Sequence, residues 1–283
     1  MNIRSFGIIG GDSRQLYCAK SIAEDGFTVR VCGFDNCDTK GVPINDISSV
    51  IKLSDALILP LPMTRNGKEL FAPFSSKPIE LAPLPEMIGS TKPVFIGLSG
   101  QTDNSFFSTL RHYFYGSREG FATANAVPTA EGAVACAINN SDITLCGSEC
   151  LVIGFGRIGK VLSSYLHGMG AYVTVSARKE KDLEMIKAFG MKGEKICNIK
   201  KRFSFIFNTV PSLMLDRERL ALLAPEALVI DLASPPGGVD DEAAEVMNIP
   251  VIHALSLPGK VAPKSAGIII KNAVYNIIGE ESL

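Results

Sequence analysis

Residues 151–159 read Leu151-Val152-Ile153-Gly154-Phe155-Gly156-Arg157-Ile158-Gly159, an apolar run that ends in the pattern G-x-G-x-x-G. Glycines with this spacing permit a tight turn, a close approach of the backbone to a pyrophosphate, and close packing of a helix against a strand. Helical spacing follows, because apolar residues recur at Ile158, Val161, Leu162, Tyr165, Leu166 and Met169. A glycine-rich turn without a ligand could carry the same letters, but the order of strand, turn and helix favours a dinucleotide site. The phosphate-binding residues would be Gly154, Gly156, Arg157, Ile158 and Gly159.

The composition limits the class of protein. A chain of 283 residues is long enough for two domains that each bury a core. Its 28 basic and 29 acidic residues give a formal net charge of -1 without a long basic cluster, which argues against a nucleic-acid partner. Apolar runs such as 56–63 are short and interrupted by prolines, so no membrane span is expected. The N-terminus lacks the features of a secretory signal, and we expect a cytoplasmic protein.

The cysteines and histidines do not suggest a metal centre. The seven cysteines form no C-x-x-C pair, and the chain has three histidines. This pattern does not match a zinc site, so no metal is expected. The odd number of cysteines, and the place of Cys32 and Cys150 in strand-like runs, favour reduced and mostly buried thiols.

Two series of strand and helix signals follow one another along the chain. In the first, Phe6-Gly7-Ile8-Ile9 leads into the turn Gly10-Gly11-Asp12 and then into a helix toward Glu24. The proline-rich residues 71–93 are expected to form an irregular loop. The expected strands are 28–32, 56–59 and 94–98 in the first series, and 150–153, 172–175, 203–207, 228–231 and 251–254 in the second. The pattern predicts an α/β protein with two doubly wound units.

Two helices are expected to connect these units. Thr129 is the expected N-cap of a helix that runs to Ile138 and crosses from the first unit to the second. Ser265 is the expected cap of a last helix that returns to pack on the first unit. The apolar side of this helix consists of Ile269, Ile270, Ala273, Val274, Ile277 and Ile278. We therefore expect a substrate domain of residues 1–126 and 264–283, and a Rossmann dinucleotide-binding domain of residues 127–263.

The end of the second strand in the Rossmann unit favours NADP(H) over NAD. An NAD site usually has an acidic residue there, which binds the ribose 2'-hydroxyl. Here the strand ends in Ser176-Ala177-Arg178-Lys179. A hydroxyl and two cations suit a 2'-phosphate, which a carboxylate would repel. Arg178 and Lys179 could instead be solvated residues at a helix start, and this alternative stays open.

Two later loops are expected to line the nicotinamide end of the cofactor. They are Asn208-Thr209-Val210-Pro211 and Ala233-Ser234-Pro235-Pro236-Gly237-Gly238, and both follow strands where ligands bind in open α/β sheets. Asn208 and Thr209 could bond to a ribose or a carboxamide. Residues that serve only the turn would look the same.

The chain resembles the family of dipicolinate synthase A subunits of endospore-forming bacteria over essentially its whole length. Its outline is also similar to 2-hydroxyacid and alanine dehydrogenases, so the resemblance implies a flavodoxin-like or Rossmann-like substrate domain in addition to the Rossmann NADP-binding domain. The motifs that carry the resemblance are Gly10-Gly11-Asp12-Ser13-Arg14-Gln15, Asn125-Ala126-Val127-Pro128-Thr129-Ala130-Glu131-Gly132, the glycine motif at 154–159, and Leu257-Pro258-Gly259-Lys260-Val261-Ala262-Pro263-Lys264-Ser265-Ala266-Gly267.

The resemblance also implies an activity and partners. The reaction would be the NADP-linked oxidation of a dihydro or hydroxytetrahydro precursor from the lysine pathway to pyridine-2,6-dicarboxylate during sporulation, in the mother cell. The partner would be the flavoprotein-like B subunit of dipicolinate synthase. A homodimer is expected by analogy with dehydrogenases of this shape.

The implied substrate suggests a binding role for the polar residues of the first and last motifs. A dicarboxylate needs two cationic or amide-lined clamps, which would be Arg14 together with Lys260 or Lys264. The turn that contains Gly11 and Asp12 lacks the full glycine spacing of a cofactor site, so it is assigned to the substrate. Glu131 and Ser265 complete the substrate-binding set.

A base must accept the ring proton as the product becomes aromatic. His253 is the candidate by its intrinsic pKa, and it is grouped with Lys260 and Lys264 as catalytic. A histidine that only fills space under a loop is an equal alternative. Asp12 and Glu131 are weaker candidates, because each also suits a helix N-terminus by its charge.

Two other functions stay open. One is an NAD(P)-dependent dehydrogenase of a 2-oxo or amino acid, although the missing strand-end acid and the turn at 10–12 argue against its NAD-using members. The other is a non-catalytic protein that binds NADP and docks a partner.

Overall fold

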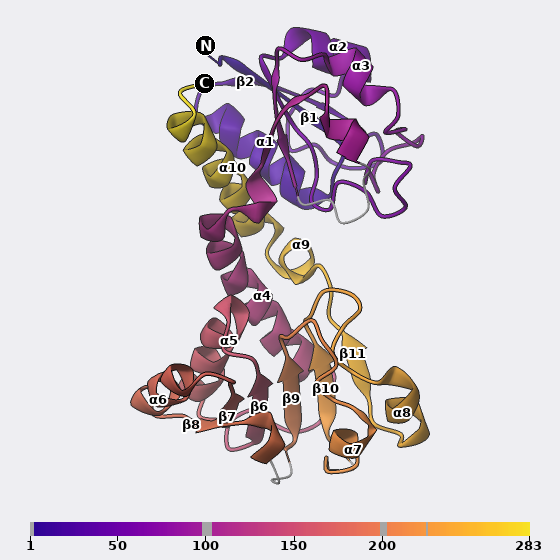
Figure 1. The fold of residues 1–283 in the computed structure, drawn as a ribbon. Helices are drawn as coiled ribbons and strands as arrows, with labels where there is room; N and C mark the ends of the chain where they lie inside the picture. The colour runs from indigo at the N-terminus through magenta and orange to yellow at the C-terminus, as the bar shows by residue number, and fades with distance from the viewer. Residues whose placement is uncertain (1–2, 98–103, 199–202, 225) are drawn as a thin grey trace. The chain divides into compact units, whose positions relative to one another are not determined.

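The protein consists of two compact α/β units. A computed structural model describes residues 3–97, 104–198, 203–224 and 226–283 (Figure 1). One unit is formed by Met1–Asn125 and Ala262–Leu283, and the other by Ala126–Val261. Within the described residues, we find no helix with the length and apolar character that crossing a membrane would require.

The first unit contains a parallel sheet of five strands in the order β2-β1-β3-β4-β5. Because the order reverses between β1 and β3, the sheet has the flavodoxin-like topology. The central strands β1, β3 and β4 are short and mostly apolar, as expected for a sheet covered on both faces. The strands are β1 (Ser5–Ile9), β2 (Thr28–Cys32), β3 (Ala56–Ile58), β4 (Pro93–Ile96) and β5 (Arg111–Phe114).

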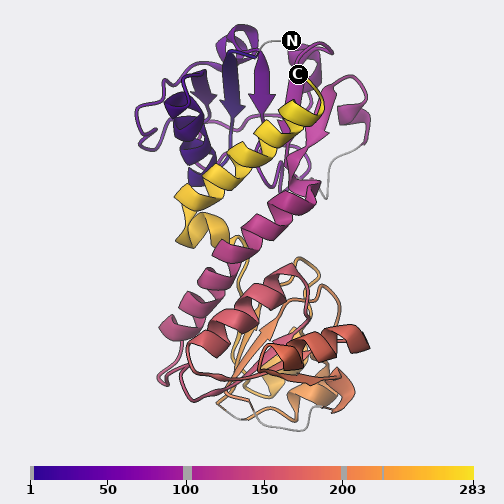
Figure 2. The same cartoon turned by 90° about the vertical axis from the view of Figure 1, so that its left-hand side faces the viewer.

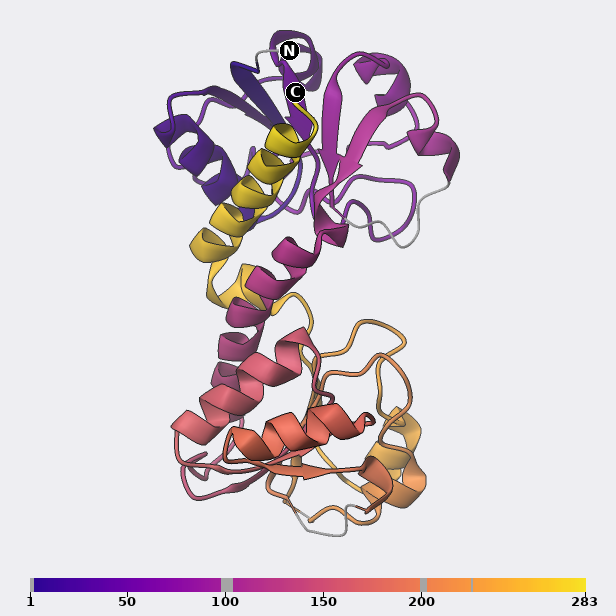
Figure 3. The same ribbon diagram turned by 60° about the vertical axis from the view of Figure 1, so that its left-hand side comes forward.

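Helices cover both faces of this sheet. On one face, α1 (Ser13–Glu24) and α10 (Pro263–Glu280) lie side by side (Figures 2 and 3). On the other face, α2 (Ile47–Leu53) and α3 (Leu84–Ile88) pack with the short helix η1 (Asn104–Phe107). A further short helix, η2 (Tyr115–Ser117), follows β5.

The returning last helix is confirmed, and its contact with α1 depends on one glycine. A Cβ at Gly267 would lie 2.5 Å from the carbonyl oxygen of Arg14 and 2.8 Å from the backbone nitrogen of Cys18, so only glycine permits this close approach. The expected cap is wrong, however. The N-cap is Ala262 without a side-chain hydrogen bond. Pro263 occupies the first turn and has no backbone N–H that would need an acceptor, and Ser265 lies exposed inside the helix.

The second unit contains a parallel sheet of six strands in the order β11-β10-β9-β6-β7-β8, which Figure 1 draws side by side. The reversal between β6 and β9 gives the Rossmann topology. The strands are β6 (Glu149–Ile153), β7 (Tyr172–Ser176), β8 (Lys192–Glu194), β9 (Phe205–Asn208), β10 (Leu228–Asp231) and β11 (Val251–His253). The expectation of two doubly wound α/β units is therefore confirmed.

Helices also cover both faces of the second sheet. The second half of α4 (Glu119–Asn139) packs with α5 (Arg157–Gly168) and α6 (Glu180–Ala188) on one face. On the other face lie α7 (Arg217–Leu220) and α8 (Asp241–Val246). The short helix η3 (Ile196–Asn198) follows β8, and α9 (Leu257–Val261) follows β11.

Some expected element bounds are wrong. Helix α4 begins at Glu119 rather than after Thr129, so Thr129 is no N-cap and Pro128 lies inside the helix. Each half of α4 packs into the core of its own unit, with Phe121 in the first and alanines such as Ala133 in the second. The stability gained from this packing offsets the stability lost with the helical hydrogen bond that a proline cannot make.

Other elements differ from the expected ones. The expected loop 71–93 contains α3, and the edge strands β5 and β8 were not expected. The strand expected to start at 203 starts at Phe205. The strand expected over 94–98 ends at Ile96, and Leu98 lies outside the described residues.

Candidate functional site

A pocket of about 590 Å³ opens at the carboxyl ends of β6, β7 and β9 in the second unit. This is the point where the strand order reverses, and open α/β sheets bind ligands at such a point. Its lining includes eight of the residues expected to bind a cofactor: Gly154, Gly156, Ser176, Arg178, Lys179, Thr209, Val210 and Pro211. The expected residues Arg157, Ile158, Gly159 and Asn208 are not part of the lining.

The three glycines of the motif differ in what surrounds them. Gly154 has a φ of +100°, and a Cβ there would lie 2.5 Å from Thr209 Oγ1. A Cβ at Gly159 would collide with the carbonyl oxygen of Gly154. A Cβ at Gly156 would meet no atom within 4 Å. The first and third glycines are therefore required by the fold. The second leaves open space in which a pyrophosphate could come close to the protein backbone.

The N-terminus of α5 faces this open space without a side-chain cap. Its N-cap is Gly156, which makes no side-chain hydrogen bond, and the first helical bond runs from Lys160 N to Gly156 O at 3.0 Å. The first amides of a helix carry a partial positive charge and bind anions such as phosphates. The arrangement fits a pyrophosphate.

The corresponding turn of the first unit is closed by the protein itself. Asp12 is the N-cap of α1 and forms a capping box with Gln15. The backbone nitrogens of Gly10 and Gly11 donate to the carbonyl oxygens of Cys32 and Phe71 at 2.9 and 2.7 Å. The nitrogen of Gly154 donates in the same way to the carbonyl oxygen of Ser176, so the difference between the two turns is the side-chain cap, which α1 has and α5 lacks.

Cations surround the strand end where the sequence predicts a 2'-phosphate. Ser176 is buried at the end of β7, and Arg178 and Lys179 are exposed and line the pocket. Lys195, which follows β8, adds a third cation, and Asp182 adds one carboxylate. Lys195 could not be predicted from the sequence, because it follows an edge strand that has no strong pattern and lies at no fixed distance from the glycine motif.

Thr209 and Asn208 are held by the protein at the end of β9. The nitrogen and Oγ1 of Thr209 both donate to the carbonyl oxygen of Ile153, at 2.9 and 2.8 Å. Asn208 is fully buried, and its amide bonds to Val210 and Asp231. The direct bond from Asn208 to a ligand that the sequence suggested is therefore replaced by bonds within the protein.

Arg14 is buried in the first turn of its unit. Its side chain is 6% exposed and ion-paired with Asp12 at 2.9 Å. Its Nε also donates to Asp12, and its Nη2 donates to the carbonyl oxygen of Leu61. Gly11, with a φ of +105°, completes the turn. The three substrate-binding candidates of this turn are thus brought together, and Arg14 braces the N-cap of α1.

His253 lies between two carboxylates at the end of β11. Its Nε2 is 2.9 Å from Asp241 Oδ1, and its Nδ1 is 3.7 Å from Asp231 Oδ2. Its side chain is 45% exposed, so it is not the space-filling histidine of the alternative interpretation.

The remaining candidates are exposed and fall on different elements. Glu131 lies on α4 and Lys260 on α9, both in the second unit, whereas Lys264 and Ser265 lie on α10 in the first. They are therefore not gathered within one unit.

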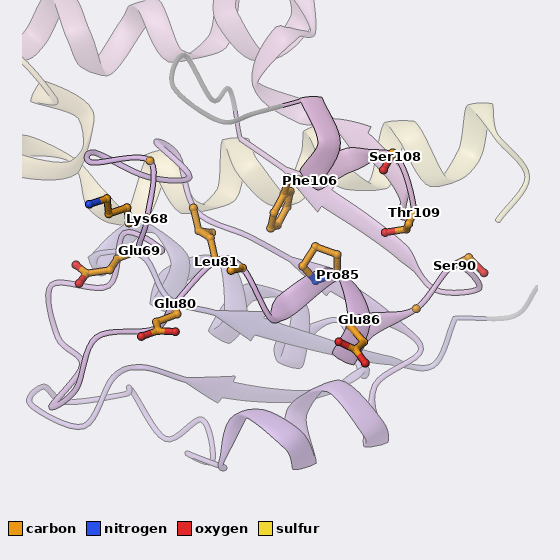
Figure 4. Close-up of a pocket in the computed structure, with 13 residues that line it drawn as sticks. Lys68, Glu69, Glu80, Leu81, Pro85, Glu86, Ser90, Phe106, Ser108 and Thr109 are labelled. Carbon is orange, nitrogen blue, oxygen red and sulfur yellow. The ribbon is translucent and has the colours of Figure 1, made fainter.

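A second pocket lies entirely in the first unit, and its charges do not suit a dicarboxylate. It measures about 1190 Å³, and Leu81 and Phe106 contribute to its lining (Figure 4). Glu69, Glu80 and Glu86 surround it against a single Lys68. Three carboxylates would repel an anionic ligand.

The cysteines are all free, and their environments differ. Burial raises the pKa of the Cys18 thiol to about 12 and that of Cys150 to about 12, whereas Cys146 and Cys197 are exposed. Among the described residues, no group of three or more His, Cys, Asp and Glu side chains could hold a metal ion.

Comparison with known proteins assigns the chain to a family. The model of the N-terminal domain of the dipicolinate synthase A subunit matches residues 5–112. The dipicolinate synthase A subunit from Bacillus subtilis (strain 168) is 31% identical over 284 residues, which cover 96% of this chain and 95% of the relative. The chain belongs to the dipicolinate synthase A-subunit family.

Solved structures of this family share the whole architecture. The dipicolinate synthase A subunit from Bacillus halodurans is 32% identical, with a TM-score of 0.87 and coverage of 97% of both chains. The A chain of dipicolinate synthase from Bacillus subtilis is 29% identical, with a TM-score of 0.85 and coverage of 100% of this chain and 98% of that one. Transhydrogenase from Sinorhizobium meliloti shares the fold at 15% identity, with a TM-score of 0.70 and coverage of 97% and 92%.

The second unit of this member of the dipicolinate synthase A-subunit family is of the dehydrogenase type. The NAD-binding domain model of D-isomer specific 2-hydroxyacid dehydrogenases matches residues 129–246, which include the whole glycine motif and the strand ends around the pocket. The match supports a nicotinamide cofactor for this unit and an oxidoreductase activity.

Proposed function

We propose that this chain is the NADP-linked oxidoreductase subunit of a dipicolinate synthase, which oxidises a dihydro or hydroxytetrahydro precursor to pyridine-2,6-dicarboxylate. One observation carries the proposal. In a chain of this family, the glycine turn of a dehydrogenase-type domain opens onto a pocket that is lined with cations and receives no carboxylate from the β7 end.

The residues of this pocket fit a dinucleotide. The open space at Gly156 and the uncapped N-terminus of α5 would receive the pyrophosphate, while Thr209, Val210 and Pro211 would line its other side. A bound nicotinamide dinucleotide supplies two-electron oxidation. The role of the chain is then to bind, to orient and to exclude water.

The charges support NADP rather than NAD. Arg178, Lys179 and Lys195 bring three positive charges to the pocket, and Asp182 brings one negative charge. A guanidinium can bind a phosphate through two parallel hydrogen bonds, which favours the 2'-phosphate. Ser176 is buried, so its contribution is to shape the strand end rather than to extend a free hydroxyl.

The proton that leaves the ring needs an acceptor, and His253 is our candidate. The hydrogen bond with Asp241 orients its ring, and the carboxylate of Asp231 lies 3.7 Å from Nδ1. The carboxylate of Asp241 accepts the hydrogen bond at 2.9 Å, so Nε2 carries the proton of the neutral ring and Nδ1 is the nitrogen that would take the substrate's proton. Asp12 and Glu131 are weaker candidates, because Asp12 is already committed to the cap of α1.

Cationic side chains would hold the two carboxylates of the substrate. Lys260 and Lys264 are exposed and available for this role. Arg14 already uses its Nε and Nη2 on Asp12 and Leu61, so its Nη1 edge is the part that would reach a carboxylate, with Gly11 and Ser265 as further polar contacts.

The proposal includes a partner and a place. The flavoprotein-like B subunit of dipicolinate synthase would act with this chain, since the names of its relatives describe one component of a synthase. We assign the pair to the cytoplasm of the mother cell of a sporulating bacterium, with this chain as a homodimer.

An activity assay tests the proposal. Purified protein is mixed with freshly generated dihydrodipicolinate and either NADP or NAD, with and without the B subunit, and both reduced cofactor and pyridine-2,6-dicarboxylate are measured. We expect both products to form in equal amounts, and faster with NADP. Tight NADP binding without turnover when both proteins are present would overturn the catalytic assignment.

A further inference from the structure

A buried carboxylate closes the end of β10 next to the cofactor pocket. Asp231 is the last residue of this strand, and its side chain is fully buried. Its Oδ1 accepts hydrogen bonds from Asn208 Nδ2 at 2.8 Å and from the backbone nitrogen of Ala233 at 3.1 Å. Its Oδ2 accepts from the backbone nitrogen of Gly238 at 2.9 Å. A charge so buried is kept only where several donors compensate it, as these do.

Asn208 extends these bonds to the wall of the pocket. Its Nδ2 also donates to the carbonyl oxygen of Val210 at 3.0 Å, and its Oδ1 accepts from the nitrogen of Val210 at 3.1 Å. One amide therefore holds both polar groups of the Val210 backbone. Because Val210 lines the pocket between Thr209 and Pro211, the carboxylate of Asp231 acts on this wall through a single intermediate residue.

The loop after β10 is closely fitted around the same pair. A Cβ at Gly237 would lie 2.8 Å from Asp231 Oδ2, and a Cβ at Gly238 would collide with Asn208 Nδ2. The carbonyl oxygen of Gly238 in turn accepts from the nitrogens of Met214 and Leu215 at 2.9 Å. Met214 also lines the pocket, so Asp231 is connected to the pocket wall a second time, through Gly238 and Met214.

We propose that Asp231 is a positioning residue for the cofactor, which fixes the wall of the pocket at Thr209–Pro211 through Asn208 and at Met214 through Gly238. This inference rests on the proposed function, because it concerns the same pocket. Asp231 touches no ligand in this scheme. It also faces His253 at 3.7 Å, so one carboxylate borders both the cofactor wall and the candidate base.

The test compares cofactor affinity with stability in three variants. Asp231→Asn removes the charge, and Asn208→Ser removes the hold on Val210 but leaves the carboxylate with its two backbone donors. Leu220→Ala is the control, because Leu220 is buried in the same unit and lines no part of the pocket. It should lower the melting temperature through the cavity it creates. The dissociation constants of NADPH and NADH are measured by calorimetry well below the melting temperature of every variant.

We expect both network variants to bind NADPH at least about tenfold more weakly, because misplaced binding groups lose affinity steeply. The control should keep the wild-type dissociation constant despite its lower melting temperature. If Asp231→Asn does not fold, Asn208→Ser decides alone. Wild-type affinity in a folded network variant overturns the inference, whereas failure of the wild-type protein to bind either dinucleotide overturns the proposed function and the inference together.

Discussion

Single residues of the glycine motif have separable physical roles. Gly154 and Gly159 are demanded by the fold, since a side chain at either would collide with Thr209 or with the backbone of Gly154. Gly156 is demanded by nothing in the protein itself. A position where a side chain would meet no atom of the protein, and which lies at a helix N-terminus in a pocket, is best explained by a ligand that binds there.

Arg178 should decide between the two dinucleotides. Replacing it with alanine removes a charge-assisted contact to the 2'-phosphate, typically worth about 1.5–3 kcal/mol, so NADPH should bind roughly 10- to 100-fold more weakly. NADH lacks that phosphate and should bind as before. Calorimetric titration measures both. Lys181→Ala is the matched control, since Lys181 is exposed nearby but does not line the pocket.

NADPH should protect one thiol and not another. Cys197 and Cys146 are both exposed, but only Cys197 lines the cofactor pocket. We expect both to react with a thiol reagent near pH 8, while Cys18 and Cys150 stay unreactive because burial raises the pKa of each to about 12. Saturating NADPH should slow labelling at Cys197 alone, as peptide mass spectrometry would show. Equal protection of Cys146 would contradict the assignment of the pocket.

Sequence spacing indicated candidate residues near the glycine motif and at strand ends, Asn208 among them, but not the contacts that depend on which strands pair. The motif glycines have a fixed spacing in the sequence, and the cations after β7 follow them at the usual sequence separation of a Rossmann unit. Lys195 joins them only because β8 pairs with β7, and Asn208 is tied to Asp231 only because β9 pairs with β10. Neither pairing can be read from spacing in a single chain.

Among the secondary-structure elements, the contact between α1 and α10 offers the sharpest test. Gly267→Ala places a methyl group against the backbone of Arg14 and Cys18, which cannot move aside as a side chain would. We expect a loss of about 1–3 kcal/mol in the free energy of unfolding, typical of overpacking. Gly279→Ala in the same helix is the control. A Cβ there meets nothing within 4 Å, so it should be neutral or stabilise by up to about 1 kcal/mol. Equal melting temperatures for the two variants would argue against close packing at Gly267.

The same two helices are also joined by an ion pair that should respond to acid. Lys271 Nζ and Tyr275 OH both contact Asp25 Oδ2, at 2.8 and 3.0 Å. The hydrogen bond from Lys271, followed by that from Tyr275, holds the pKa of Asp25 below its ordinary value of 3.8. Its stabilising effect is therefore present above that ordinary value and is lost as the pH falls through the lower folded-state pKa.

Asp25→Asn should accordingly lower the melting temperature by at most a few degrees at pH 7, since exposed ion pairs contribute about 0.2–1 kcal/mol. The difference from the wild type should shrink below about pH 4. Asp38→Asn is the control, because Asp38 pairs with Lys40 two residues away and joins no elements. A difference that persists undiminished in acid would show that the charge of Asp25 is not its cause.

The element bounds show where local signals fail. The apolar side of α10 could be predicted because its spacing is regular over almost three turns, from Ile269 to Ile278. Its start was not readable, because Ser265 and Pro263 both carry start signals and the proline prevails. Pro128 likewise led to a wrong helix start. The helix α4 continues through this proline because the residues on both sides of it pack into a core. The edge strands β5 and β8 are short and partly exposed, so neither has a strong apolar pattern.

The whole chain consists of two α/β units that each have their own hydrophobic core. Both were predictable, because each repeats the alternation of strands and helices around its own glycine turn. What the sequence could not show is that the turn of the first unit is closed by Asp12 and Arg14, whereas that of the second is open at Gly156. The contrast supports a dinucleotide site in the unit Ala126–Val261 rather than at the turn of the first unit.

Calorimetric melting of the wild type and of Gly156→Val, each with and without NADPH, decides whether the dinucleotide binds at this turn. Gly156 has an extended backbone and free space around its Cβ position, so the variant should fold, and the loss of a glycine N-cap should lower its ligand-free melting temperature by only a few degrees. NADPH at about 100 times its dissociation constant should stabilise the wild-type second unit by about 2.7 kcal/mol. It should shift the variant little at the same concentration, because the valine fills the space of the pyrophosphate. An equal shift in both proteins, or none in the wild type, would contradict the assignment of the site to this turn.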